Sequence, residues 1–328
     1  MTKLNILGIG NAIVDVLGYC SDDDLTNRQL QKGGMSLIDE ATAETLYDQM
    51  GQAEEQSGGS AANTVAALAG LGLKCGFVGK VRDDQLGKIF SHDLKGIGVE
   101  FITPAASDGP STARCLIHVT PDAQRTMATY LGACITLAPT DIDQEQVKNA
   151  DITYVEGYLW DAPAAIEAIE KALKTAKDSG NKTAFTLSDT FCVARHREAF
   201  LKLAAEVDIL FANEAEVMAL FEENDIEAAL TKLSDICNLA AVTMGEKGAV
   251  VLSKSERHDV AADAVEKLED TTGAGDLFAA GFLYGVAQNW PLPECARLGN
   301  KTAGRIIQQL GARSLKPLTD LIDEARAA

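Results

Sequence analysis

The sequence predicts an α/β protein with a mostly parallel central sheet. From about residue 150 onward, longer amphipathic stretches alternate with short apolar runs that are typical of buried strands, at residues 152–156, 183–187, 207–212 and 239–244. The first half continues this style, because strand-like residues 4–9 and 75–81 flank a helical pattern at 60–71. Such alternation indicates βαβ crossovers. In sheets of this kind, ligands bind beyond the carboxyl ends of the strands.

The clearest helical pattern covers residues 162–178. Asp161 can cap its start, Pro163 suits its first turn, and Gly180 can end it. A chain of 328 residues can form either one α/β domain with an appended subdomain or two independent domains.

Several segments of the first half do not fit the alternating pattern. They favour strands without intervening helices, which predicts antiparallel pairing outside the main sheet, and they are residues 34–38, 99–103, 111–120 and 125–131. We expect a small β lid formed by approximately residues 16–20, 31–38, 98–104 and 111–133. Turn-forming residues at 120–124 predict a hairpin between its last two strands.

Charge and composition exclude several classes of partner. The formal charge of −19 argues against a nucleic-acid surface, because binding along a phosphate backbone requires neutralisation by Lys and Arg. No apolar run reaches the roughly 18 residues needed to span a bilayer, and the N-terminus lacks the basic and apolar regions of a signal peptide. Seven scattered cysteines are typical of reduced, packed side chains. We therefore expect a cytoplasmic protein without a membrane or nucleic-acid partner.

Residues 270–283 combine a glycine-rich turn, a carboxylate and the start of an apolar helix. The backbone is nearly bare at three residues, Gly273, Ala274 and Gly275. Unpaired N–H groups at a helix start, reinforced by the macrodipole, favour a bound anion. A carboxylate at Asp276 would oppose that anion unless it serves as a general base. The alternative is a tight turn with Asp276 as the helix N-cap, an arrangement worth about 1 kcal/mol.

Two further loops follow predicted strands. Glu216 could hold Mg²⁺ through water, because magnesium keeps much of its hydration shell. Alternatively, Asn213 caps a helix whose first turn carries solvated glutamates. In the next loop, Gly245 and Gly248 permit a close backbone approach to a phosphate or ribose, and Thr243 offers a hydroxyl. A hairpin that binds no ligand is the alternative for this loop.

Near the N-terminus, Asp15 and Asn63 supply an acceptor and an amide that suit the paired hydroxyls of a polyol or ribose. Gly58 and Gly59 let the chain pass close to a ligand. Asp15 could instead be an ordinary turn residue. All these segments lie at predicted strand ends, so we expect them to meet at one edge of the sheet.

The same segments, in the same order, resemble the motifs of the PfkB/ribokinase family of sugar and nucleoside kinases. They are residues 10–15, 58–63, 213–216, 243–248 and 270–276, and the last is the most specific. The resemblance spans nearly the whole chain. It implies one ribokinase-like domain over residues 1–328, a three-layer αβα fold with a mostly parallel sheet and a small β-sheet lid. It also implies ATP and Mg²⁺ as cofactors and, in many members, K⁺.

The resemblance implies a role for each matching residue. Asp276 matches the catalytic base, and the preceding anion hole matches Gly273, Ala274 and Gly275. The residues that match contacts to the nucleotide and its phosphates are Asn213, Thr243, Gly245, Gly248 and Gly275. Asn300, in the late helix 291–309, matches a residue that lies beside the adenine. Glu216 belongs to the segment that organises Mg²⁺. The residues similar to a K⁺ loop are Asp270, Thr272 and Gly311. Acceptor contacts match Asp15, Gly58, Gly59 and Asn63.

Further details favour a nucleoside as the acceptor. Asn11 and Arg125 are similar to residues of adenosine kinases that lie near the nucleoside or its transferred phosphate, and Ser60 agrees with this assignment. Arg125 could neutralise the phosphate as it moves. In contrast, Thr272 is more typical of sugar kinases, because the adenosine enzymes tend to carry asparagine there.

We therefore expect an ATP-dependent kinase that phosphorylates the primary hydroxyl of a nucleoside and converts adenosine to AMP. The alternatives are a sugar kinase of the ribokinase or fructokinase type and a catalytically silent regulator that binds nucleotide or nucleoside. The expected partner is a small-molecule nucleoside or sugar, and the protein is expected to be a monomer or a homodimer.

Overall fold

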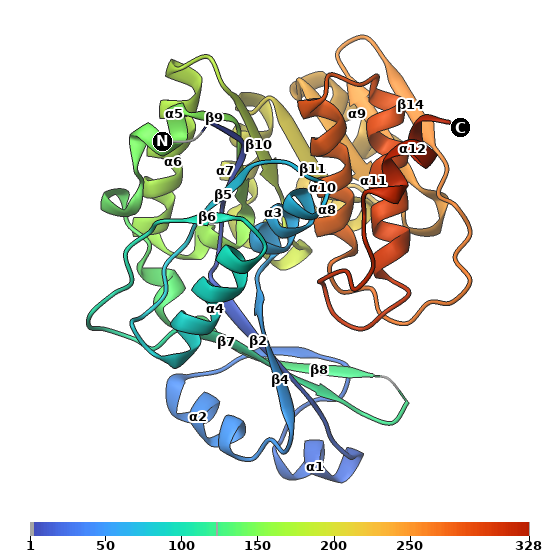
Figure 1. The fold of residues 1–328 in the computed structure, drawn as a ribbon. Helices are drawn as coiled ribbons and strands as arrows, with labels where there is room; N and C mark the ends of the chain where they lie inside the picture. The colour runs from blue at the N-terminus through green and yellow to red at the C-terminus, as the bar shows by residue number, and fades with distance from the viewer. Residues whose placement is uncertain (1–2, 123, 328) are drawn as a thin grey trace.

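Two β-sheets organise the chain. A computed structural model describes residues 3–122 and 124–327. The large sheet has nine strands in the order β14-β13-β12-β11-β10-β9-β1-β5-β6, and the small sheet has five in the order β3-β8-β7-β2-β4. Figure 1 shows the small sheet, with helices α1 and α2, at one end of the molecule below the large sheet.

The large sheet is mostly parallel, as predicted. Pairing is parallel from β6 through β5, β1, β9, β10 and β11 to β12, and β13 and β14 add an antiparallel edge. Its strands are β1 (Leu4–Ile9), β5 (Cys75–Val78), β6 (Glu100–Phe101), β9 (Ala150–Glu156), β10 (Lys182–Thr186), β11 (Ile209–Asn213), β12 (Leu239–Thr243), β13 (Ala249–Ser253) and β14 (Arg257–Val260).

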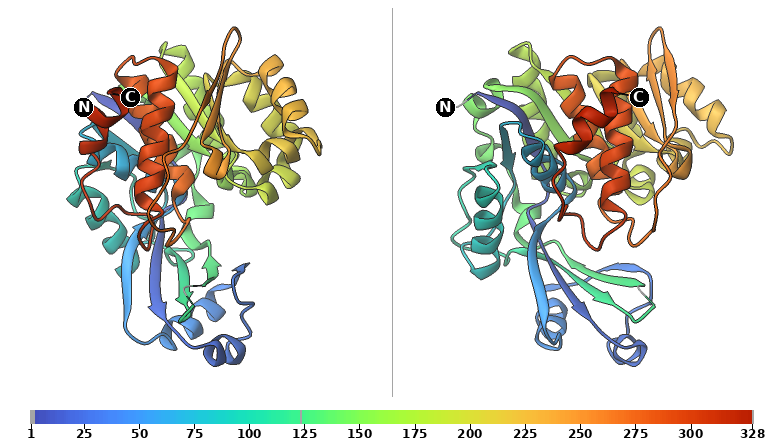
Figure 2. Two further views of the ribbon diagram at one scale, coloured as in Figure 1. Left: turned by 90° about the vertical axis from the view of Figure 1, so that its right-hand side faces the viewer. Right: turned by 45° about the vertical axis from the view of Figure 1, so that its right-hand side comes forward.

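Helices cover both faces of this sheet and complete three layers (Figure 2). Successive residues of a strand point to opposite faces, so Ile6 packs on one side and Leu7 on the other. The core around Ile6 includes side chains from α3 (Ser60–Gly70), α4 (Gln85–Gly96), α10 (Ala274–Ala287), α11 (Leu292–Ile306) and α12 (Asp320–Arg326). The core around Leu7 includes α5 (Gln144–Lys148), α6 (Pro163–Asp178), α7 (Thr190–Glu206), α8 (Glu214–Phe221) and α9 (Ile226–Ile236).

The predicted helix 162–178 is confirmed as α6, with Pro163 in its first turn. The expected cap is wrong, however, because the N-cap residue is Ala162. The Asp161 carboxylate instead accepts hydrogen bonds from Arg195 Nε (2.9 Å) and pairs with His196 Nε2 (2.7 Å). An ion pair with α7 therefore outcompetes the local capping bond.

Three of the four segments expected to form the lid contribute strands to the small sheet. Its strands are β2 (Ile13–Tyr19), β3 (Met35–Leu37), β4 (Ala53–Gly58), β7 (Ala113–Val119) and β8 (Arg125–Tyr130), with helices α1 (Asp22–Asn27) and α2 (Glu40–Asp48) nearby. β7 and β8 pair antiparallel as the predicted hairpin requires, although Ala123 in their connection lies outside the described residues. The sheet as a whole is mixed, because β2–β7 and β3–β8 pair in parallel.

Two features of the small sheet differ from the expectation. Assigning residues 98–104 to the lid was wrong, because β6 pairs with β5 at the edge of the large sheet. The sequence also does not reveal β4, whose residues include Glu54, Glu55 and Gln56. These side chains have little strand preference, and pairing along β2 makes this segment a strand.

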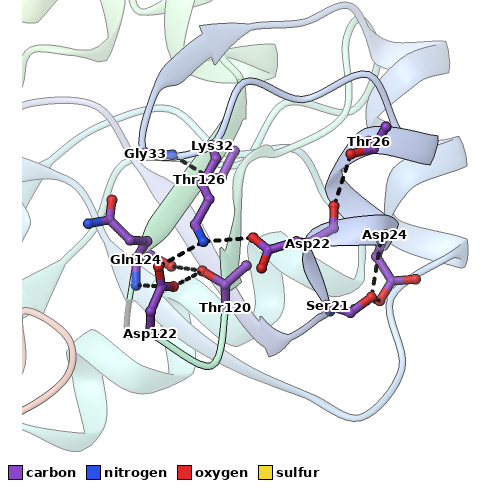
Figure 3. A network of polar contacts seen from close by, with 10 residues as sticks. All are labelled: Ser21, Asp22, Asp24, Thr26, Lys32, Gly33, Thr120, Asp122, Gln124 and Thr126. Carbon is purple, nitrogen blue, oxygen red and sulfur yellow. Dashed lines mark hydrogen bonds and ion pairs between the residues drawn. The ribbon is translucent and has the colours of Figure 1, made fainter.

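A polar network anchors the β7–β8 hairpin (Figure 3). Lys32 Nζ lies 2.6 Å from Asp22 Oδ1 and 2.7 Å from Asp122 Oδ2. The Gly33 N–H donates to Thr126 Oγ1 (3.0 Å). Because Thr126 directly follows Arg125, these contacts hold the strand that carries this arginine.

Two short crossings join the sheets and shape the site between them. Residues 10–12 connect β1 to β2, and Gly59 connects β4 to α3. Among the helices of residues 3–122 and 124–327, none has the length and apolar character that crossing a bilayer requires. All seven cysteines are free, and all except Cys20 are buried.

Candidate active site

A cavity of about 510 Å³ lies between the small sheet and the carboxyl ends of the parallel strands. The predicted site residues in its lining are Asp15, Gly59, Ser60, Asn63, Asn213, Glu216, Thr243, Thr272, Gly273, Ala274, Gly275 and Asp276. The small sheet contributes further side chains, including Met127 and Thr129. Segments separated by more than 200 residues in the chain thus meet at one cavity, as their positions at strand ends predict.

Asp276 is held by two donors from α3. Ser60 Oγ donates to Asp276 Oδ1 (2.6 Å), and Asn63 Nδ2 donates to Asp276 Oδ2 (2.9 Å). Asp276 is the third residue of α10, whose N-cap is Gly273. The interpretation of Asp276 as the helix N-cap is therefore wrong, and its carboxylate is oriented by another helix.

The turn before Asp276 is open toward a ligand at one glycine. Gly273 has a φ of 77°, and a Cβ there would lie 2.7 Å from Ala312 Cβ, so packing demands glycine. Gly275 is exposed, and a Cβ there would meet nothing within 4 Å. The Ala274 N–H donates to Thr271 O (3.1 Å), whereas the N–H groups of Gly275 and Asp276 lie in the first turn, where no intrahelical acceptor exists. This geometry favours an anion beside Gly275.

Arg313 supports the start of α3 beside the site, and the sequence did not reveal this residue. Its guanidinium donates to Ser57 O (Nε 3.1 Å, Nη2 3.0 Å), Ser57 Oγ (Nη2 3.1 Å) and Ala62 O (Nη1 2.8 Å). It therefore ties the segment after α11 to the start of α3, the helix that carries Ser60 and Asn63. A single arginine in a C-terminal loop forms no motif, so no sequence signal marks it.

Burial governs the two aspartates of the cavity. It raises the pKa of Asp276, and the hydrogen bonds from Ser60 and Asn63 and the nearby Arg313 charge oppose this rise. Burial raises the pKa of Asp15 to about 7, although Arg313 and Arg125 favour its charged form. A carboxylate with a raised pKa is a stronger base, which suits proton abstraction from a hydroxyl.

Glu156 is a second residue that the sequence analysis missed. Its side chain is fully buried, at 0% exposure. The Asn11 N–H donates to Glu156 Oε1 (2.8 Å) and the Ala61 N–H donates to Oε2 (2.8 Å). Glu156 thus joins the end of β9 to both crossings between the sheets. An acidic residue at the end of an apolar strand was the one available signal.

Gly58 and Gly59 leave room for neighbouring groups of the protein itself. A Cβ at Gly58 would lie 2.3 Å from Asp15 Oδ2. Gly59 has a φ of 94°, and a Cβ there would lie 2.3 Å from Asn11 O. The close approach expected for a ligand is therefore made first by Asp15 and Asn11, which places Asp15 against the cavity wall.

Asn213 and Glu216 form a capping box at the start of α8. The Asn213 side chain accepts from the Glu216 N–H (2.9 Å), and Glu216 accepts from the Asn213 N–H (3.0 Å) and from Nδ2 (2.6 Å). The capping alternative is confirmed for Asn213, but Glu216 is buried rather than solvated, and burial raises its pKa to about 7. With both oxygens accepting from Asn213, Glu216 fits contact with Mg²⁺ through water better than direct ligation.

The second strand-end loop is a hairpin between β12 and β13. Thr243 lines the cavity, and a Cβ at Gly248 would lie 2.1 Å from Val260 O, so this glycine serves packing against β14. Asn300 Nδ2 donates to Val260 O (3.0 Å) and Ala261 O (3.1 Å), next to the same strand. Gly245 has a φ of 60° and open space beside it. Nucleotide contacts by these residues stay predictions.

The buried carboxylates make the stability of the protein depend on pH. Burial raises the pKa of Asp15, Glu156 and Glu216 to about 7, so the folded state binds protons that unfolded carboxyls release near pH 4. Their stabilising contribution is complete below about pH 4 and is lost as pH rises through about 7.

We therefore expect the melting temperature of the ligand-free protein to fall between about pH 4 and pH 7, measured by differential scanning fluorimetry. Glu156→Gln should flatten this dependence, because it removes one of the three groups. A melting temperature that rises across the same window would contradict the assignment.

Comparisons with known proteins find relatives over most of the chain. The sequence model of the pfkB family carbohydrate kinases matches residues 34–319. An ATP-dependent ribose-1-phosphate kinase from Halopiger xanaduensis is 30% identical over 268 residues, covering 82% of this chain and 86% of the relative.

Solved structures extend the likeness to the whole chain. The adenosine kinase from Sinorhizobium meliloti is 49% identical, with a TM-score of 0.91. A probable sugar kinase protein from Rhizobium etli CFN 42 is 47% identical, with a TM-score of 0.92. In each case the match covers 100% of both chains. The three-layer fold with its small second sheet is thus shared with these proteins.

Proposed function

Because this chain belongs to the pfkB family of carbohydrate kinases, which are phosphotransferases with alcohol acceptors, we propose that it transfers the γ-phosphoryl group of ATP to the primary hydroxyl of adenosine. One observation carries this proposal. The Asp276 carboxylate is held by Ser60 and Asn63 in the same cavity wall as the open backbone of Gly275. A base and an anion cradle on consecutive residues can serve one hydroxyl and the phosphoryl group it attacks.

The proposed mechanism relies on alignment and charge. Asp276 takes the proton of the acceptor hydroxyl as the hydroxyl oxygen attacks the γ-phosphorus, and the bond from the γ-phosphorus to the bridging oxygen breaks to release ADP. The first-turn amides of α10 stabilise the charge on the phosphoryl oxygens. Mg²⁺, held through water near Glu216, would neutralise part of the charge of ATP. Asp15 accepts hydrogen bonds from other hydroxyls of the acceptor, and the small sheet excludes water that would compete for the phosphoryl group.

Adenosine is proposed as the acceptor on two grounds. The Sinorhizobium meliloti relative, an adenosine kinase, is 49% identical over the full chain. The lining of the cavity also adds apolar groups of the small sheet, Ile13 and Met127, to Asp15 and Asn63, which suits a base joined to a ribose. The second candidate is a sugar kinase, which the Halopiger xanaduensis relative and Thr272 favour.

Release of ADP, measured in a coupled assay with adenosine, ribose and fructose as acceptors, tests this proposal. We expect kcat/KM for adenosine to exceed that for either sugar by at least about 100-fold, because the base adds binding energy that free sugars lack. A higher value for ribose or fructose would replace adenosine by a sugar. Asp276→Asn is the matched control, since contaminating kinases would be unaffected by it.

A further inference from the structure

The loop of residues 270–272 leads into the anion cradle, which is the turn at residues 273–275. A side chain of the small sheet neutralises the carboxylate of this loop. Arg125 Nη2 lies 2.8 Å from Asp270 Oδ2, and Arg125 Nη1 donates to Thr272 Oγ1 (3.1 Å). The side chains of this ion pair are only 8% and 6% exposed. Because Thr272 directly precedes Gly273, a permanent positive charge lies beside the start of the cradle.

Two of the three residues expected to bind K⁺, Asp270 and Thr272, have side chains that already contact partners within the protein. Asp270 Oδ1 accepts from the Thr272 N–H (3.0 Å) and from Thr272 Oγ1 (2.8 Å). Asp270 Oδ2 accepts from the Gly311 N–H (3.0 Å) and faces Arg125. Three hydrogen bonds and one ion pair thus meet this carboxylate, which offers about four lone-pair positions.

The remaining group of the expected K⁺ site is also engaged. Thr272 Oγ1 gives its proton to Asp270 and accepts a hydrogen bond from Arg125. The Gly311 N–H donates to the same carboxylate. A second cation at this carboxylate would in addition be repelled by the guanidinium.

We propose that the Arg125 guanidinium takes the place of a monovalent cation beside the anion cradle, so that phosphoryl transfer by this protein does not require K⁺. The planar guanidinium bridges Asp270 and Thr272, a contact that holds the loop before Gly273 in one position. The β7–β8 hairpin supplies this charge, and the Lys32 network anchors the hairpin (Figure 3). The proposal concerns the cation alone and holds for a nucleoside or a sugar acceptor.

Steady-state kinetics in chloride salts of K⁺, Na⁺ and tetramethylammonium at equal ionic strength test the proposal. For the parent protein we expect kcat to differ by less than about twofold between the salts. For Arg125→Ala, which frees one side of the Asp270 carboxylate, we expect a lower kcat that K⁺ raises at least about fivefold over tetramethylammonium. Activation of the parent by K⁺ to that extent, or an Arg125→Ala variant indifferent to K⁺, would overturn the proposal.

Thermal unfolding provides a readout that needs no acceptor. K⁺ should raise the melting temperature of Arg125→Ala above its value in tetramethylammonium, and it should leave the parent unchanged. Arg125→Gln, which keeps a polar side chain, serves if the alanine variant does not fold. Lys32→Ala is the matched control, because it loosens the same hairpin but keeps the Arg125–Asp270 pair. A K⁺ response in Lys32→Ala equal to that of Arg125→Ala would overturn the assignment to Arg125.

Discussion

Asp276→Asn should abolish phosphoryl transfer while leaving nucleotide binding largely intact. The amide cannot accept a proton from the acceptor hydroxyl, whereas the backbone cradle at Gly275 does not depend on this side chain. We expect kcat to fall by about 10²–10⁴-fold, the usual contribution of a positioned general base. Single-turnover kinetics, together with calorimetric titration of ATP, would separate the loss of chemistry from a loss of binding.

A variant of a residue that orients Asp276 provides the matched control. Ser60→Ala removes one of its two hydrogen-bond donors and keeps the base, so we expect a loss in kcat smaller than that of Asp276→Asn. If Asp276→Asn retains more than about a tenth of the parental kcat, another group takes the proton and the mechanism proposed above is wrong.

Glu156→Ala should have the largest effect on stability. It leaves the buried N–H groups of Asn11 and Ala61 without an acceptor. Each unpaired buried donor costs about 1–3 kcal/mol, so we expect a loss of about 2–6 kcal/mol. Because these N–H groups lie at the two crossings between the sheets, KM for the acceptor should rise as well. Thermal unfolding and steady-state kinetics measure the two effects.

Two further variants sharpen this prediction. Glu156→Gln keeps the size of the side chain and one acceptor, so its loss of stability should be about half that of Glu156→Ala. Glu167→Ala changes an exposed glutamate on α6 and should remain within about 0.5 kcal/mol of the parent. A Glu156→Ala protein as stable as the Glu167→Ala control would show that the two hydrogen bonds contribute nothing.

Sequence reasoning succeeded where the signal is local. The glycines before Asp276 and the apolar run after it predict the start of α10, and the structure places both at the cavity. It failed where partners are distant in the chain. Glu156 and Arg313 contact residues 95 to 256 positions away, and their neighbours in sequence carry no motif. Strand β4 was missed for the same reason, because its polar residues form a strand only beside β2.

The sequence by itself determined the parallel α/β architecture, the family resemblance and the identity of the residues at the strand ends. These features follow from hydrophobic periodicity and from short motifs, which depend on neighbouring residues. Only the tertiary structure decided that Ser60 and Asn63 orient Asp276 and that Arg125 neutralises Asp270. Hydrogen bonds and ion pairs between remote segments depend on how the sheets and helices pack, and that packing is not encoded in any single stretch of the chain.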